Sequence, residues 1–218
     1  MKFHPDIIRF LSDLKENNDR EWFNANKNNY LKVKAEFENT VAKIITEVGA
    51  FDDDIKYLTP AECTFRIYRD TRFAKDGEPY KTNMGAYMAK NGRKSIYAGY
   101  YLHIEPGKSF AGGGIYMPLP ENLLKIRQEI CNFSSDFETI IRTPEFKKVY
   151  GELETIDALK KMPKGFPADA PDIIRHKHFI ASYSIPDTLF SQDNFTENIV
   201  NIFKTLQPLN AFFNRALE

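Results

Sequence analysis

The sequence lacks an excess of either charge, because thirty Lys and Arg residues balance thirty Asp and Glu residues over 218 positions. This balance argues against a nucleic-acid or membrane partner, since both kinds of partner attract basic surfaces. The chain also lacks any apolar run near the ~20 residues that a membrane helix needs. Residues 1–6 lack the apolar stretch of a signal peptide. We therefore expect a cytoplasmic protein with no membrane partner.

Cysteine and histidine are scarce, which limits metal and redox chemistry. Cys63 and Cys131 lie far apart and form no Cys-x-x-Cys pair, so we expect both to be small buried apolar residues. His176 and His178 would share one face of a strand, but a zinc site needs three or four ligands. No phosphate-binding loop, nucleophile elbow or dinucleotide fingerprint is present. The sequence therefore predicts no metal site and no cofactor.

Both ends of the chain have the apolar spacing of amphipathic helices. Pro5 suits the first turn of one helix, and Asn18 with Glu21 can form a capping box for a second. The second helix keeps a 3.6-residue rhythm up to Gly49, a natural C-terminal stop. Further helices are expected over 123–133, over about 136–151 and at the C-terminus, with a kink or break near Pro208.

The middle of the chain has the composition of strands. β-branched and aromatic residues predict a strand over 63–69, whereas 70–94 predicts a long ordered loop, which is uncommon unless functional. The turn at 105–108 has Pro and Gly where a type II turn needs them, and glycines 112–114 indicate a bulge or a close approach to the backbone. Three further strands are expected, over 96–105, 109–117 and 177–185.

These patterns predict an α+β fold, with a central, mainly antiparallel sheet and helices from the N-terminal and C-terminal regions packed against it. We expect a single domain over 1–218, made of a helical N-terminal segment, 1–50, and a core of mixed sheet and helix, 51–218. A chain of this length can bury a sizeable core.

The segment from 64 to 83 carries the most information about function, because cationic and aromatic residues alternate along it. From Arg66 to Lys94 there are eight Lys or Arg residues and three Asp or Glu residues, a local excess of 8 − 3 = +5. Burying a guanidinium group costs free energy unless an anion pairs with it. The candidate ligand-binding residues of this segment are Arg66, Tyr68, Arg69, Asp70, Arg72, Tyr80 and Lys81.

Side chains alternate along a strand, so Phe65 and Ile67 would share a buried face while Arg66 and Tyr68 point to a surface cleft. In a functional interpretation, Arg66, Arg69 and Lys81 converge on a phosphate, sulfate or carboxylate, with tyrosines as walls. In a structural interpretation, the cations pair with nearby acids and order a long loop. Because cations outnumber the local acids, the sequence favours the functional interpretation.

Other residues are weaker candidates. Asn26 and Lys27 lie beside aromatic residues on the second helix, where Asn26 would form a helix-to-loop hydrogen bond or contact a ligand. His103 lies in the predicted hairpin and could act as a catalytic general base if it faces the arginine-rich segment. A histidine in such a place more often makes a local hydrogen bond.

Four stretches resemble one protein family, the domain-of-unknown-function family numbered 2461 of bacteria and fungi. They are Asn17-Asn18 with Trp22-Phe23, Asn26-Lys27 and Tyr30; the string 65–84; the string 99–103; and the string 164–167. The arginine-rich string is the most specific of these. The resemblance covers nearly the whole chain and implies one cytoplasmic domain, but it implies no activity.

Three functions remain open at this point. The first is binding of a small anionic ligand, bearing phosphate or carboxylate, at a cleft of arginines and tyrosines, with the reaction unknown. The second is a structural or protein-interaction module whose arginines are paired internally. The third is a nucleic-acid-associated protein that uses the local basic excess and its tyrosines. The sequence favours the first function, and it leaves the oligomeric state and any enzymatic activity open.

Overall fold

The computed structural model describes residues 3–70 and 77–218, which form an α+β fold with helices packed on a four-stranded antiparallel sheet. The predicted fold class is therefore confirmed. Among the described residues, no helix is both long enough and apolar enough to cross a membrane. The buried side chains form one connected apolar core that runs from Phe3 to Leu217. This continuity supports the single-domain organisation, which stays a prediction.

The N-terminal region forms three helices, α1 (Pro5–Glu16), α2 (Arg20–Ala25) and α3 (Lys27–Val48). The prediction of one helix capped by Asn18 was wrong. The Asp19 carboxylate instead accepts from the Trp22 backbone N–H at 2.8 Å, because the Asn18 side chain is bound elsewhere, as described below. The helix is broken at Asn26, whose backbone leaves helical geometry (φ −100°, ψ 11°). The predicted stop at Gly49 is confirmed.

The sheet is an antiparallel meander in the order β1-β2-β3-β4. Its strands are β1 (Met84–Ala89), β2 (Gly99–Ile104), β3 (Phe110–Ile115) and β4 (Phe179–Ser184). The predicted hairpin is confirmed, and its turn is closed by a 3.0 Å hydrogen bond from the Lys108 N–H to the Glu105 carbonyl. β1 lies inside the region predicted as a loop, so that prediction was wrong over 84–89. β1 has no β-branched residue, and its hydrogen-bonded pairing with β2 stabilises it as a strand.

The strand predicted over 63–69 is not a regular strand. Cys63 ends a short helix, α4 (Pro60–Cys63), which a capping box of Thr59 and Glu62 begins. Beyond it the chain is extended and makes two isolated bridges, Thr64 with Ala86 and Tyr68 with Tyr80. Residues 64–70 and 77–83 run antiparallel to each other beyond the Met84 end of β1, and we call these two segments the arm.

The remaining helices are α5 (Pro120–Asn132), α6 (Ser134–Ile141), α7 (Pro144–Tyr150) and α8 (Phe195–Leu217), with 3-10 turns at Asp172–Arg175 and Asp187–Ser191. The single helix predicted over 136–151 is two helices, because Thr143 and Pro144 begin a new one. The Thr143 hydroxyl caps it by accepting from the Phe146 N–H at 3.2 Å. α8 continues through Pro208, so of the predicted kink or break the break is absent, and the kink stays a prediction.

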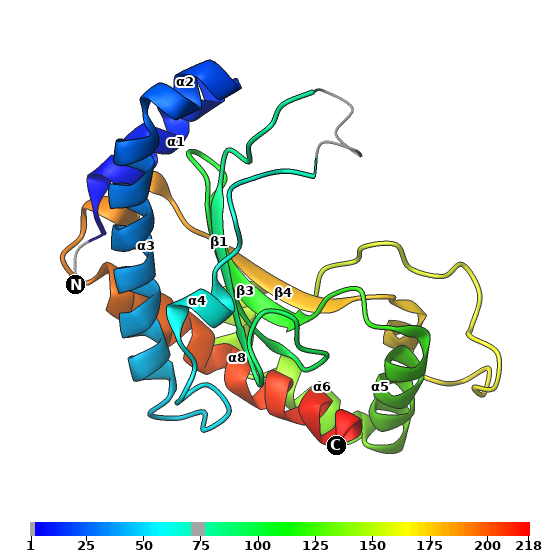
Figure 1. Cartoon of the computed structure of the whole chain (residues 1–218). Helices are drawn as coiled ribbons and strands as arrows, with labels where there is room; N and C mark the ends of the chain where they lie inside the picture. Colours follow the sequence, from blue (N-terminus) through cyan, green and yellow to red (C-terminus); the bar gives the residue numbers. More distant parts are fainter. Residues whose placement is uncertain (1–2, 71–76) are drawn as a thin grey trace.

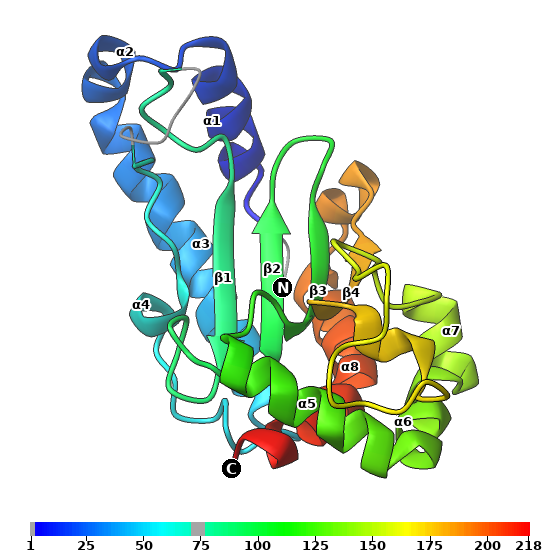
Figure 2. The ribbon, with the colours of Figure 1, turned by 90° about the vertical axis from the view of Figure 1, so that its right-hand side faces the viewer.

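Helices cover one face of the sheet and leave much of the other exposed. In Figure 1, α3 stands along one side, α8 crosses behind the strands, and the arm extends from the upper end of the sheet. Tyr100 of β2 packs its ring 5.2 Å from that of Phe203 on α8. Figure 2 looks onto the opposite face, where α5 crosses only the lower end and the segment 151–178 lies beside β4. We call this the open face.

A polar pair lies within the helix-covered side. The Tyr100 hydroxyl donates to the Asp52 carboxylate at 2.6 Å. Burial raises the pKa of Asp52, although hydrogen bonds from Tyr100 and from the Asp54 N–H oppose this effect. A carboxyl whose pKa is raised in the folded state stabilises the protein fully below its unfolded pKa of about 3.8. That stability is lost as the pH rises through the raised pKa.

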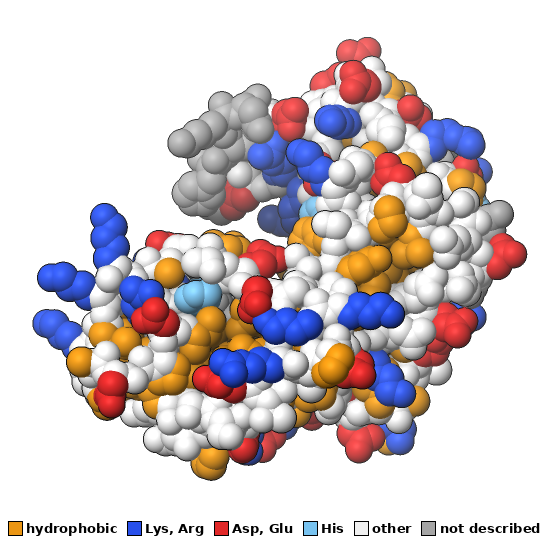
Figure 3. Space-filling model, turned by 180° about the vertical axis from the view of Figure 1, so that it is seen from behind, with side chains coloured by type: hydrophobic (Ala, Val, Ile, Leu, Met, Phe, Trp, Pro, Cys, Tyr) orange, Lys and Arg blue, Asp and Glu red, His pale blue; other side chains and the backbone are white. Residues whose placement is uncertain are grey.

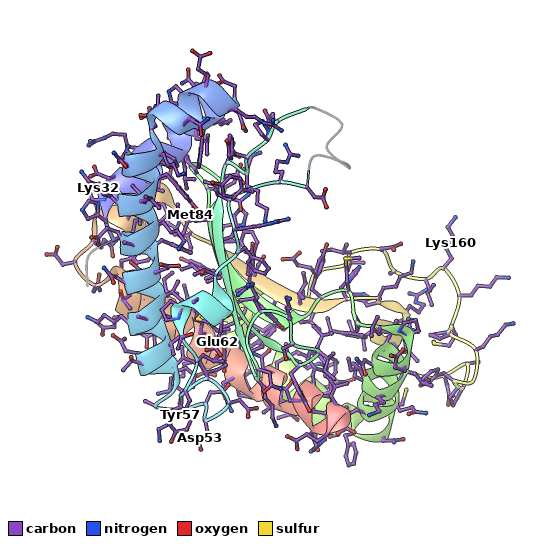
Figure 4. The ribbon with its side chains drawn as sticks, viewed as in Figure 1. Lys32, Asp53, Tyr57, Glu62, Met84 and Lys160 are labelled. Carbon is purple, nitrogen blue, oxygen red and sulfur yellow. The ribbon has the colours of Figure 1, made fainter. Side chains whose placement is uncertain are left out.

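We therefore expect Asp52→Asn to gain stability relative to the wild type as the pH rises from about 4 to 7. Asparagine can still accept from Tyr100, but it never bears the buried charge. Urea unfolding at several pH values measures the difference. Asp53→Asn, at the exposed neighbouring carboxylate labelled in Figure 4, is the control and should show a smaller pH-dependent gain. Equal gains for both variants would contradict the assignment to Asp52.

Candidate functional site

Alternation along β2 divides its side chains between the two faces of the sheet. Tyr100, Leu102 and Ile104 are fully buried towards the helices. Tyr101 and His103 are partly buried and point to the open face, and Glu105 follows with the same alternation just beyond the strand. One strand therefore presents a phenol, an imidazole and a carboxylate in a row.

These three side chains form a hydrogen-bonded chain. His103 Nε2 lies 3.1 Å from Glu105 Oε2, and His103 Nδ1 lies 3.1 Å from the Tyr101 hydroxyl. A carboxylate can only accept, so the imidazole proton belongs on Nε2. Nδ1 of the neutral ring is then an acceptor, and the Tyr101 hydroxyl donates to it. The arrangement places an acceptor for the phenolic proton directly beside the Tyr101 oxygen.

Neighbouring strands fix the rings of this chain. Phe110 of β3, paired with His103 across the sheet, stacks on the imidazole with ring centroids 4.8 Å apart and an interplanar angle of 16°. Gly85 of β1 lies on the other side, where an added Cβ would come within 2.7 Å of the Tyr101 hydroxyl. A glycine at this position therefore leaves room for the phenol. Burial and the Glu105 carboxylate raise the pKa of Tyr101 to about 12.

The arm is fixed to the N-terminal helices by one amide and one aromatic stack. The Asn18 side chain donates to the Tyr80 carbonyl at 3.0 Å and accepts from the Tyr80 N–H at 3.2 Å, so it pairs with the backbone as a strand would. Phe23 of α2 stacks on the Tyr80 ring at a centroid distance of 3.9 Å and meets Tyr68 edge-on at 5.8 Å. Tyr80 is only 5% exposed and therefore lies in the core.

The cations of the arm fall into two groups. Arg69 forms an ion pair with Glu78 at 3.1 Å. Within residues 3–70 and 77–218, by contrast, no carboxylate forms an ion pair with Arg66 or Lys81. Burial, and then the charge of Arg66, lower the pKa of Lys81. Arg66 and Lys81 thus lie near each other, and neither forms an ion pair with a carboxylate in the described part of the chain.

Aromatic contacts connect Lys81 to the open face. Its ammonium lies 5.6 Å from the centroid of the Phe65 ring, a cation–π contact. Phe65 in turn meets Tyr101 edge-on, with centroids 6.2 Å apart. Lys81 and the Tyr101–His103–Glu105 chain are therefore on the same side of the sheet.

The molecule is hollowed beside this part of the sheet. Figure 3 shows a hollow between two lobes, with Lys and Arg side chains on its wall and a histidine among them. A pocket of about 880 Å³ lies at the end of β4, lined by Phe110, Ser182 and Ser184 among others. Ser182 of the same face donates its hydroxyl to Glu154 from the segment beside β4. The open face thus has space for a small molecule.

The structure brings together some of the residues predicted from the sequence. Lys81 contacts the Phe65 ring and His103 contacts the Tyr101 ring of one aromatic pair, and Arg66 lies close enough to Lys81 to lower its pKa. Tyr68 is 44% exposed and packs on Phe23 as part of the arm, and Asp70 is exposed at the end of its first segment. Arg72 lies outside the described residues.

The contacts of Asn26 and Lys27 do not connect them to this group, and their role in binding stays a prediction. The Asn26 side-chain amide donates to the Trp22 carbonyl at 3.0 Å, a local bond within the helical region. Lys27 is exposed at the start of α3. No interaction in the described part of the chain joins either residue to Arg66, Lys81 or His103.

Sequence reasoning missed Tyr101, Glu105, Phe65 and Asn18 as contributors to the site. For Tyr101 and Glu105 a signal was present, because residues at i, i+2 and i+4 around His103 share one face of a strand. For Phe65 and Asn18 none was present, since their partners come from distant parts of the chain.

The remaining histidines and cysteines show no cluster. Among the described residues, no group of three or more His, Cys, Asp or Glu side chains could hold a metal ion. His178 Nδ1 instead accepts from the Met117 N–H at 2.9 Å. Cys63 is buried and Cys131 partly buried, and both are free thiols.

The fold and the site together define an α+β protein with an open sheet face, a polar chain of side chains upon it and a cationic arm beside it. The family model described as "Conserved hypothetical protein (DUF2461)" matches residues 6–212 of the 218. The chain belongs to this family. Comparison with curated proteins and with solved structures gave no match.

Proposed function

We propose that the protein binds a small anionic ligand, bearing phosphate or carboxylate, between the arm and the open face. The observation that supports this most directly is the pairing state of Arg66 and Lys81, which lie close together with no carboxylate partner in the described residues. Placing two like charges together costs free energy unless an anion offsets their repulsion. A bound anion would supply the missing charge.

The alternative of internal pairing accounts for Arg69 but not for this pair. Arg69 lies between the two segments of the arm and binds Glu78, as a structural residue would. Lys81 is half-buried and contacts the Phe65 ring, so it gains a cation–π contact but no neutralising charge from residues 3–70 and 77–218. We assign Arg66 and Lys81 to the ligand and Arg69 to the arm itself.

A cytoplasmic location fits this proposal. Both cysteines of the described residues are free, which suits a reducing compartment. Small phosphorylated and carboxylated metabolites are abundant there.

A thermal-shift series with phosphate, pyrophosphate and citrate tests the proposal, with ionic strength held constant by chloride. A ligand at ten times its Kd stabilises the folded state by about 1.4 kcal/mol, which for a chain of this size raises Tm by about 3–6 °C. We expect at least one of the three anions to produce this shift in the wild type. Arg66→Ala and Lys81→Met should lose it.

Lys32→Ala is the matched control, because Lys32 is exposed on α3 and points away from the sheet in Figure 4. It should retain the full shift. The proposal fails if none of the three anions raises Tm, or if Arg66→Ala responds as strongly as Lys32→Ala.

A further inference from the structure

We propose that Tyr101 is a nucleophile, activated by His103 and Glu105, that accepts the phosphoryl group of a small anionic phosphate ester. The inference rests on the proposed function, because Arg66 and Lys81 would hold the ester. Two cations with no carboxylate partner among the described residues match the roughly two negative charges of a phosphate monoester better than the single charge of a carboxylate. The proposal thus names both a reactive group and a substrate class.

The geometry that carries the inference is that of an activated nucleophile. Such sites share a hydroxyl or thiol bonded to a base, with the base held by a third group. Here the Tyr101 hydroxyl is 3.1 Å from His103 Nδ1, and Nε2 of the same ring is 3.1 Å from Glu105. Stacking on Phe110 further fixes the orientation of the ring. Glu105 is thus a positioning residue, and it would stabilise the imidazolium that forms.

The chemical step balances without any further reagent. The Tyr101 oxygen forms a bond to phosphorus while the bond from phosphorus to the ester oxygen breaks. The phenolic proton passes to His103 Nδ1, and the leaving oxygen takes the electron pair of the broken bond. His103 can then give that proton to the leaving alcohol. Nothing is oxidised or reduced, and the products are an alcohol and phosphorylated Tyr101.

Because the pKa of Tyr101 is raised, its reactivity depends on proton transfer to His103. With its pKa raised to about 12 by burial and Glu105, free phenolate is scarcer at neutral pH than for an exposed tyrosine. Without proton transfer to the histidine, Tyr101 would therefore react more slowly than a residue such as Tyr57, which is 84% exposed. Faster reaction at Tyr101 is consequently a signature of the histidine and not of exposure.

Sulfonyl fluorides test this, because their tetrahedral sulfur resembles phosphorus and the sulfonate adduct is stable. We would treat the full chain at pH 7.5 with 4-(fluorosulfonyl)benzoate, which is anionic, and follow each tyrosine by peptide mass spectrometry. Tyr101 should be modified at least about tenfold faster than Tyr57 in the same sample. His103→Phe should slow Tyr101 by about 100-fold and leave Tyr57 unchanged.

Glu105→Gln is the second variant, since it keeps a side-chain acceptor for Nε2 while removing the charge. We expect a smaller loss, about tenfold, together with a shifted dependence of the Tyr101 rate on pH. A merely structural Glu105 would leave that pH profile unchanged. The inference is overturned if Tyr101 reacts no faster than Tyr57 in the wild type.

A neutral probe, phenylmethanesulfonyl fluoride, separates this inference from the proposed function. Arg66→Ala should slow modification of Tyr101 by the anionic probe but not by the neutral one, whereas Lys32→Ala should affect neither. If Arg66→Ala has no effect with the anionic probe while Tyr101 is still modified faster than Tyr57, the proposed anion site is wrong and the activated tyrosine stands. If Tyr101 is slow with both probes while phosphate still raises Tm, the activated tyrosine is wrong and the anion site stands.

Discussion

Phe23→Ala is expected to lower the free energy of unfolding by about 3–5 kcal/mol, as measured by urea denaturation. The Phe23 side chain is 1% exposed, and its ring stacks on Tyr80 and also contacts Phe10 and Tyr30. Removing it leaves a cavity between the N-terminal helices and the arm. Since this stack helps to attach the arm to the helices, the loss should also reach the candidate site.

That second effect is measured by hydrogen exchange at the Lys81 amide, which donates to the Ile67 carbonyl at 2.8 Å within the arm. Phe23→Ala should speed its exchange and reduce any thermal shift by phosphate. Phe203→Ala is the matched control, because Phe203 is fully buried on α8 and contacts Tyr100 far from the arm. Equal exchange at Lys81 in the two variants would show that Phe23 stabilises only the general core.

Gly113→Val is expected to destabilise the fold by about 3 kcal/mol or more. An added Cβ at Gly113 would lie 2.7 Å from Leu206 Cδ2 and 2.0 Å from the Gly99 carbonyl oxygen. The leucine can move, but the carbonyl belongs to a paired strand and cannot shift without disturbing the sheet. The substitution would thus separate β3 from β2 or lift α8 from the sheet.

Gly107→Ala is the comparison for this effect, because nothing lies within 4 Å of an added Cβ there and only the left-handed backbone (φ +74°) is strained. It should cost about 1–2 kcal/mol. Chemical denaturation of both variants gives the difference. If Gly113→Val cost no more than Gly107→Ala, the close approach of α8 to β3 would be wrong.

The parts of the fold that local sequence patterns specify could be predicted. The helical rhythm of α1 and the turn at 105–108 are encoded by neighbouring residues, and both appear where expected. The end of α3 before Gly49 was also predicted, but its start at Lys27 was not. β1 could not be predicted, since Met-Gly-Ala-Tyr-Met-Ala has little strand preference and becomes a strand through its partner β2.

The candidate site was predictable in composition but not in detail. The local excess of cations identified the arm, yet only the three-dimensional arrangement separates Arg69, which has a carboxylate partner, from Arg66 and Lys81. His103 was a candidate base from its place in the hairpin. Its partners Tyr101 and Glu105 could have been predicted from strand alternation. The contact of Lys81 with Phe65, in contrast, depends on the register of the arm.

The pairing of Asn18 with Tyr80 has a consequence for the order of folding. The two residues are 62 positions apart, so the chain must close a long loop before this contact can form. Closing such a loop costs conformational entropy, which is offset only when the native contacts form. The helices and the β2–β3 hairpin, in contrast, assemble from near neighbours. We expect the arm to reach its native position late, so that a refolding molecule would regain its overall shape before the arm is attached to the helices.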